Sequence, residues 1–218
     1  MLGMVRSSPW RGAAALLSVF CLGAPAFAAA GPESAAELAR GGLRACEDGR
    51  RLQDRDTRLA YFERGRALAQ RAVALDERSA DAHFALFCNM GEIMRIDGES
   101  LSALVGLHRL MSELDRTLEL DPNHTDALAA KGQLLIRLPR WVGGDAQRGE
   151  QMLRQVIQQD PEAFSSRLML AKTCDARGER EEALAFARRA MQIAQAQKRA
   201  DKIAQAHAAL AELNADPE

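Results

Sequence analysis

The side chains best suited to chemistry in this chain are four histidines that lie far apart: His83, His108, His124 and His207. Two histidines that bind one metal ion from a single helix usually stand four residues apart, and no two of these do. The chain also lacks the Gly-x-Ser-x-Gly and His-Glu-x-x-His motifs of common hydrolases. We therefore expect no metal, no cofactor and no catalytic site. A hydrolase or transferase with an unrecognised site is the alternative from the enzyme class.

The first residues have the pattern of a secretory signal peptide. Arg6 and Arg11 supply positive charge, residues 13–23 are apolar, and residues 26–28 read Ala-Phe-Ala, a typical cleavage site. The apolar run is shorter than the roughly 20 residues of a transmembrane helix, so we prefer cleavage to an uncleaved anchor. We expect residues 1–28 to be a signal peptide and residues 29–218 to form one domain without a membrane span. The compartment would be the periplasm of a bacterial cell.

The charge balance argues against a nucleic-acid partner. Removing the signal peptide takes away two arginines and no acids, which leaves a net charge of about −3 on the mature chain. A nucleic-acid-binding domain would be expected to carry a basic patch or stripe.

Three cysteines remain after signal cleavage: Cys46, Cys88 and Cys174. Their spacing matches no zinc motif. We interpret them as small buried side chains. The alternative is a disulfide between Cys46 and Cys88, because both fall on helices that we expect to be neighbours. The odd count then leaves one thiol over.

Apolar residues recur at helical spacing along the chain, and alternating strand patterns are nearly absent, so we predict an all-α fold. Short turn sequences separate the expected helices. Three contain proline, which rarely lies inside a helix: Asp121-Pro122, Pro139–Gly144 and Asp160-Pro161. The fourth is Asp97-Gly98. The expected helices cover about residues 33–47, 58–75, 79–95, 101–120, 123–138, 145–160, 162–176, 179–195 and 199–213.

Similar sequences recur where these helices end: AVALD at 72–76, TLELDP at 117–122, VIQQDP at 156–161 and AMQIA at 190–194. The last interval, from Asp160 to Ala194, is 34 residues, the period of a tetratricopeptide repeat. The intervals before it are longer, 45 residues from Asp76 to Asp121 and 39 from Asp121 to Asp160. Longer turns between paired helices would absorb the difference at little cost.

Residues 163–194 resemble a tetratricopeptide repeat in detail. Ala171, Ala183 and Ala190 stand where that family has small residues, and Gly178 stands in its turn. Only small side chains fit where two helices cross closely. The resemblance implies a right-handed helix–turn–helix solenoid of about four irregular repeats, closed by a capping helix at 199–213. Phe87 departs from the pattern, because a small residue is usual there.

In such solenoids the first helix of each repeat lines the concave binding face. The resemblance thus implies that the partner-binding residues include Phe84, Glu92, Gln133, Arg137 and Lys172. Arg137 and Lys172 would suit an acidic peptide, unless they are ordinary solvated charges. Some relatives hold a peptide C-terminus with Lys and Asn at fixed positions. Those positions here hold Phe84, Ala129, Leu168, Cys88, Gln133 and Lys172, so we do not expect that mode of binding.

The loop at Pro139–Gly144 contains Trp141, a second kind of candidate. Tryptophan is over-represented at interface hot spots. The alternative is that Trp141 folds back and covers the gap between helices. The Gly143-Gly144-Asp145 sequence lacks the lysine and preceding strand of a phosphate loop, so we interpret Asp145 as a helix N-cap.

The stretch LPRxxGGDxxxG at Leu138–Gly149 is similar to periplasmic tetratricopeptide proteins associated with TRAP-type transporters. We interpret the chain as an exported, non-catalytic scaffold for protein–protein interaction in the cell envelope, either monomeric or homo-oligomeric. The alternative implied by this second resemblance is an accessory component of a TRAP-type solute-uptake system, which binds a solute-binding protein or a small apolar ligand.

Overall fold

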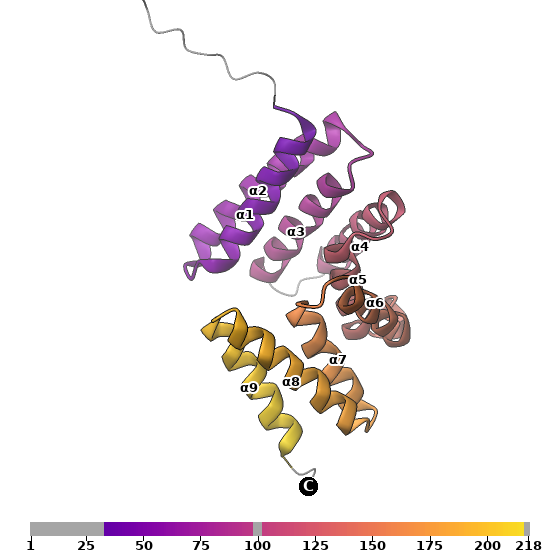
Figure 1. Ribbon diagram of the computed structural model, residues 1–218. Helices are drawn as coiled ribbons and strands as arrows, with labels where there is room; N and C mark the ends of the chain where they lie inside the picture. The colour runs from indigo at the N-terminus through magenta and orange to yellow at the C-terminus, as the bar shows by residue number, and fades with distance from the viewer. Residues whose placement is uncertain (1–32, 98–101, 216–218) are drawn as a thin grey trace, which may run out of the picture. The chain divides into compact units, whose positions relative to one another are not determined.

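In a computed structural model that describes residues 33–97 and 102–215, the chain is a succession of α-helices (Figure 1). No strand occurs within these ranges. The helices are α1 (Ala35–Arg51), α2 (Arg55–Leu75), α3 (Ala80–Asp97), α4 (Ser102–Leu120), α5 (Thr125–Arg137), the short 3-10 helix η1 (Arg140–Val142), α6 (Ala146–Gln159), α7 (Phe164–Ala176), α8 (Arg180–Ala196) and α9 (Ala200–Asn214). The expected signal peptide lies outside the described residues.

The boundary between α1 and α2 differs from the prediction. The sequence suggested an end near Glu47 and a new start near Arg58, whereas the break is confined to residues 52–54. Asp54 caps α2, because its carboxylate accepts a hydrogen bond from the backbone N–H of Thr57 at 2.8 Å. The cap allows α2 to begin earlier than its apolar pattern indicates.

The helices pack as consecutive pairs, as the repeat pattern predicts: α1 with α2, α3 with α4, α5 with α6, and α7 with α8. The last helix, α9, packs against α8 and α7 and buries Ala206, Ala209 and Leu213. The expected all-α repeat solenoid with a terminal helix is therefore confirmed.

Small residues lie at the closest helix crossings. A Cβ atom on Gly132 of α5 would lie 2.8 Å from the carbonyl oxygen of Gly149 on α6, and one on Gly149 would lie 2.6 Å from that of Gly132. Two backbones can approach this closely only where neither residue has a side chain. Ala171 of α7 and Ala183 of α8 share a buried cluster in the next pair, and Gly178 between them has the predicted turn role with φ of 79°.

The first helices of the repeats are not evenly packed. Helix α1 packs closely against α3, but close backbone contacts are few between α5 and α7 and fewer still between α3 and α5. Large side chains fill the space beside them, among them Phe84 and Phe87 of α3 and Leu110 and Leu114 of α4. The bulky Phe87, which departs from the repeat pattern, belongs to this cluster.

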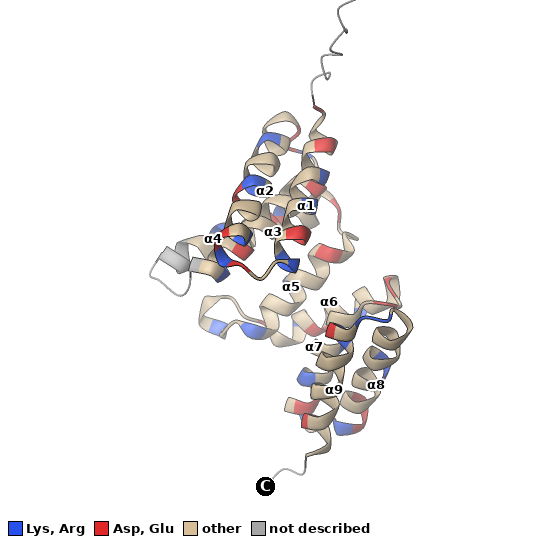
Figure 2. Ribbon diagram, turned by 90° about the vertical axis from the view of Figure 1, so that its left-hand side faces the viewer, with Lys and Arg blue, Asp and Glu red and all other residues tan. Residues whose placement is uncertain are grey.

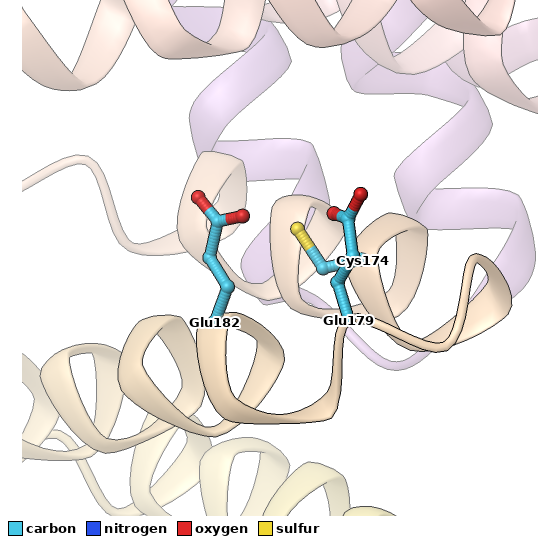
Figure 3. Close-up of side chains that lie close together, drawn as sticks. All are labelled: Cys174, Glu179 and Glu182. Carbon is cyan, nitrogen blue, oxygen red and sulfur yellow. The ribbon is translucent and has the colours of Figure 1, made fainter.

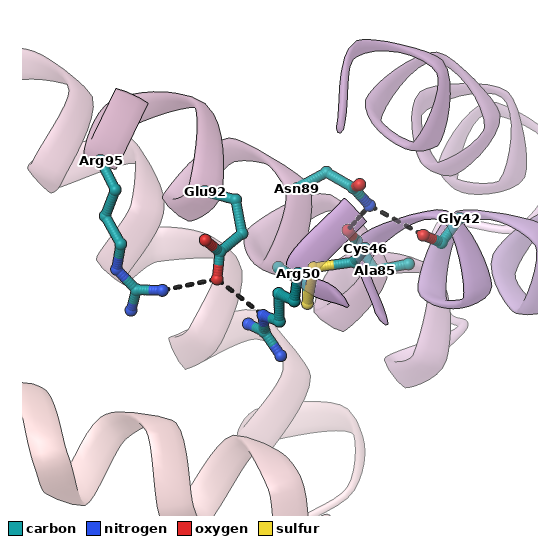
Figure 4. The surroundings of a disulfide bond; sticks show 8 residues. Gly42, Cys46, Arg50, Ala85, Asn89, Glu92 and Arg95 are labelled. Atoms are coloured by element: carbon teal, nitrogen blue, oxygen red, sulfur yellow. Dashed lines mark hydrogen bonds and ion pairs between the residues drawn. A yellow bond between two sulfur atoms is a disulfide. The ribbon is translucent and has the colours of Figure 1, made fainter. Parts of the chain in front are cut away.

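Three successive contacts join α1 to α3 (Figure 4). The buried Asn89 side chain donates from Nδ2 to the carbonyl oxygen of Gly42 at 2.9 Å. One turn further along α1, Cys46 forms a disulfide with Cys88 of α3, with a Cα–Cα distance of 6.3 Å. One turn beyond that, Arg50 donates from Nε to Glu92 Oε1 at 2.6 Å.

The disulfide corrects the interpretation of the cysteines as three unpaired buried side chains. Cys46 and Cys88 lie on first helices that are neighbours, so the bridge considered as the alternative is the one present. Cys174, the third cysteine of the described residues, has a free thiol and is fully buried in α7.

Charged residues of both signs are interspersed over the described helices (Figure 2). None of these helices combines the length and the apolar character that crossing a membrane requires.

Candidate functional site

The main candidate site is a groove of about 830 Å³ beside the loosely packed α3 and α5. Helices α1, α3, α4 and α5 supply its walls, with Ser165 of α7 at one end. Its apolar lining includes Phe84, Phe87, Met94, Leu107, Leu110 and Leu134. The groove exists because α3 and α5 do not close on each other in the way that α1 and α3 do.

The aromatic side chains in the groove are fixed in place. The Phe84 ring stacks on Phe87 with 5.7 Å between centroids and lies 4.7 Å from the imidazole of His124. His124 is itself held, because its Nδ1 accepts a hydrogen bond from the backbone N–H of Ala127 and caps α5. A rigid apolar surface of this kind loses little conformational entropy when a partner binds.

The structure changes the role expected for Glu92. Its side chain is 4% exposed, and its carboxylate oxygen accepts hydrogen bonds from Arg50 at 2.6 Å and Arg95 at 2.5 Å. A carboxylate buried and paired in this way is not available to a partner. Arg50 and Arg95, which the sequence did not indicate, line the groove, whereas Glu92 does not. Glu92 therefore orients groove residues rather than facing the groove itself.

Gln133, Arg137 and Lys172 lie where the repeat alignment places them. Gln133 and Arg137 line the groove and also a smaller adjoining hollow of about 370 Å³ between α5, α7 and α9. Lys172 lines this hollow, here called the side hollow. Four of the five residues predicted for the binding face, Phe84 among them, thus border two adjoining depressions.

Trp141 lies apart from both depressions and projects outward. It is 79% exposed, so the interpretation that it folds back over a gap between helices is wrong. Its turn is nevertheless ordered by backbone hydrogen bonds from Gly144 N to the Pro139 oxygen at 3.0 Å and from Asp145 N to the Leu135 oxygen at 2.9 Å. Trp141 therefore stands exposed on a well-anchored turn, where contact with a partner would add buried area at little entropic cost.

A second cluster of reactive side chains lies where α7 ends and α8 begins (Figure 3). The ligand atoms of Cys174, Glu179 and Glu182 lie within 4.8 Å of one another, which is compatible with metal binding by distance alone. However, Arg177 donates to Glu179 at 2.5 Å, and Arg154 donates to Glu182 at 2.9 Å. Burial, helped by the charge of Glu182, raises the pKa of the Cys174 thiol to about 11. The thiol is then protonated at neutral pH and the carboxylates are paired, so the cluster fits an ion-pair network better than a metal site.

Sequence reasoning found Phe84 but missed other groove residues on α3 and α4, among them Phe87, Met94, Leu107 and Leu110. The signal was present in Phe87, the one bulky residue at a position where tetratricopeptide repeats have a small one. The departure of Phe87 from the repeat pattern thus indicated where the first helices of two neighbouring repeats, α3 and α5, do not pack closely.

The comparisons with known proteins bear on the fold. No protein-family model matches the sequence, and no curated protein matches it. Solved structures do match. TTC0263, a tetratricopeptide protein from Thermus thermophilus, is 19% identical, with a TM-score of 0.54 over 82% of this chain and 100% of that one.

Two further structures are similar at the same level. PilF from Pseudomonas aeruginosa is 15% identical, with a TM-score of 0.52 over 84% of this chain and 78% of that one. MamA is 15% identical, with a TM-score of 0.51 over 77% of this chain and 82% of that one. At these identities the similarity shows the tetratricopeptide-like fold, in agreement with the repeat pattern read from the sequence.

Proposed function

We propose that this protein is a non-catalytic scaffold that binds a segment of another protein in the groove between α3 and α5. The single observation that carries the proposal is the groove itself, about 830 Å³ of rigid, mainly apolar surface in a helical repeat fold. Apolar side chains of a partner would enter between Phe87, Met94 and Leu134, while the arginines at the rim would meet its polar groups.

Two features of the molecule, one in the groove and one outside it, support a protein partner. Its aromatic side chains are buried against each other and do not need to rearrange, which favours binding. Trp141 offers a separate exposed anchor of the residue type that contributes most at protein interfaces.

The test is capture of partners by the purified mature chain from an extract of the source cells. Ala129 lines the groove from α5 and is half-buried, so Ala129→Glu places a charge in the wall without disturbing the core. Ala60→Glu on the exposed side of α2 is the matched control. We expect a partner that is retained by wild type and by Ala60→Glu and is lost by Ala129→Glu. Equal retention by all three proteins would contradict the proposal.

We further propose that the protein is exported and acts in the cell envelope. The Ala-Phe-Ala sequence at 26–28 and the two preceding arginines support cleavage of a signal peptide. The Cys46–Cys88 disulfide also supports it, because disulfides persist in oxidising compartments. Mass spectrometry of the protein from its native cells should give an N-terminus near Ala29. An intact N-terminus in a cytosolic fraction would refute export.

An accessory role in TRAP-type solute uptake is a second candidate. The volume of the groove falls within the range of roughly 300–1,000 Å³ that is typical of small-molecule sites. Native mass spectrometry of the protein from its source cells distinguishes the two functions. A bound small apolar molecule that Ala129→Glu displaces would favour the uptake role over a protein segment.

A further inference from the structure

A second pocket of about 830 Å³ lies away from the groove, between α6 and α7. It shares no lining residue with the groove and shares only Met169 and Lys172 with the side hollow. Four cationic side chains line it: Arg140, Arg154, Lys172 and Arg177. Its two acidic side chains are Glu150 and Glu179, so the charged lining has an excess of positive charge.

Glu150 forms ion pairs with two of these cations, Arg154 and Arg177. Its side chain is 10% exposed and contacts Arg177 and, at 2.8 Å, Arg154. Hydrogen bonds from Arg177 hold the pKa of Glu150 below its ordinary value, with a smaller contribution from Arg154. Arg154 and Arg177 each bind a second carboxylate, Glu182 and Glu179 respectively. The acidic groups of this region are therefore already committed to the two arginines.

The other two cations are not balanced in this way. Within the described residues, no ion pair involves Arg140 or Lys172, and both are exposed at the edge of the pocket. The two acids of the lining, Glu150 and Glu179, are already bound by Arg177, and Glu150 also by Arg154. Lys172 also lines the side hollow, whose one acidic lining residue is Glu212. The pocket thus presents two cations without an ion-pair partner beside two guanidinium groups that three carboxylates hold in place, and these seven charges sum to +1.

The rest of the lining suits a polypeptide better than a single small ion. Ile136, Met169, Ala146 and Ala176 form apolar wall, and Gln147 and Gln151 offer amide groups for hydrogen bonds. A volume of about 830 Å³ accommodates several residues of extended chain. Aliphatic stems of glutamate side chains would contact the apolar wall while their carboxylates reach the cations.

We propose that this pocket, here called the cationic pocket, binds an acidic segment of the partner protein, with Arg140 and Lys172 as the residues that take its carboxylates. The inference rests on the proposed scaffold function and adds the chemistry of the partner. Because the side hollow contacts both the groove and this pocket through Arg137 and Lys172, one partner chain can place apolar residues in the groove and acidic residues here.

The test is fluorescence anisotropy with a fluorescein-labelled hexaglutamate peptide, titrated with the protein at roughly 0.05 M salt, where charge attraction is only weakly screened. Arg140→Glu/Lys172→Glu removes the two cations that have no ion-pair partner. Arg64→Glu/Arg188→Glu changes two exposed arginines outside the pocket and alters the net charge equally, which makes it the matched control.

We expect the pocket variant to bind the peptide about tenfold more weakly than wild type and the control to stay within about twofold. Equal weakening of both variants would show general charge attraction and overturn the proposal, as would no binding by wild type. Ala129→Glu in the groove should leave hexaglutamate binding unchanged. The peptide titration tests the proposal for the cationic pocket, and partner capture tests the proposal for the groove. The failure of one proposal is therefore distinguishable from the failure of the other.

Discussion

The pairs α3–α4 and α5–α6 are built by opposite means. In α5–α6 two glycines, Gly132 and Gly149, bring the helix backbones together. In α3–α4 the space is filled by Phe84, Phe87, Leu110 and Leu114, and a groove remains next to α5. The comparison teaches that glycine at a crossing lets two helix backbones meet closely, whereas packing through large side chains leaves a groove beside the helices.

The irregular repeat is stabilised by other means. The disulfide between Cys46 and Cys88 lies beside the groove, one turn from the Arg50–Glu92 ion pair. A covalent bond and a half-buried ion pair thus join α3 to α1, in addition to the close packing of Gly42 against Ala85.

The largest effect should follow from removing that bond. A disulfide closing a loop of 42 residues stabilises the folded state by about 3–4 kcal/mol, chiefly by restricting the unfolded chain. Cys46→Ala/Cys88→Ala should therefore lower the free energy of unfolding in urea by about that amount. The control is reduced wild type, which should match the variant. Equal stability of oxidised wild type and the variant would mean that the bond contributes nothing.

The two kinds of packing can be compared directly with glycine substitutions. Gly149→Ala places a methyl group 2.6 Å from a carbonyl oxygen, and such overpacking costs about 1–3 kcal/mol. Gly91→Ala at the groove meets only Leu110, at 3.5 Å. Its better helix propensity should stabilise the protein by about 0.5–1 kcal/mol. Thermal unfolding should therefore give a lower midpoint temperature for Gly149→Ala and a higher one for Gly91→Ala. Shifts of both midpoints in the same direction would contradict the difference in packing.

Strong acid should break the α6–α7 ion pairs that Glu150 makes. The pKa of Glu150 is lowered from its ordinary value of 4.5 because Arg177 and then Arg154 bind the carboxylate. A lowered pKa means that the stabilisation is complete above about pH 4.5 and is lost as pH falls through the folded-state pKa. Glu150→Gln should cost about 1–2 kcal/mol at pH 7. It should also flatten the fall in stability below about pH 4.5. A variant with the same acid sensitivity as wild type would place the titrating group elsewhere.

The smallest effect on stability should come from Trp141→Ala. The side chain is 79% exposed, so the free energy of unfolding should change by no more than about 0.5 kcal/mol. Partner retention in the capture experiment should nevertheless fall. A large loss of stability with unchanged retention would give Trp141 a structural role.

The sequence indicated the helices, their pairing and the small residues at Ala171 and Ala183, because each leaves a local pattern of spacing or size. It could not indicate how far α3 and α5 stand apart, because that distance depends on several large side chains packing together. The same limit explains Glu92. Its position in the repeat was correct, but its burial depends on Arg50, which lies on another helix 42 residues away.

The most direct test of the central claim is site-specific photo-crosslinking in the native cells. A benzoylphenylalanine at Gln133, which lines both the groove and the side hollow, is compared with one at Ala60 on the outer side of α2. The account predicts a discrete crosslinked polypeptide from Gln133, lost when Ala129→Glu is added, and none from Ala60. No adduct from Gln133, or the same adduct from both positions, would contradict the proposal that the groove binds a protein segment.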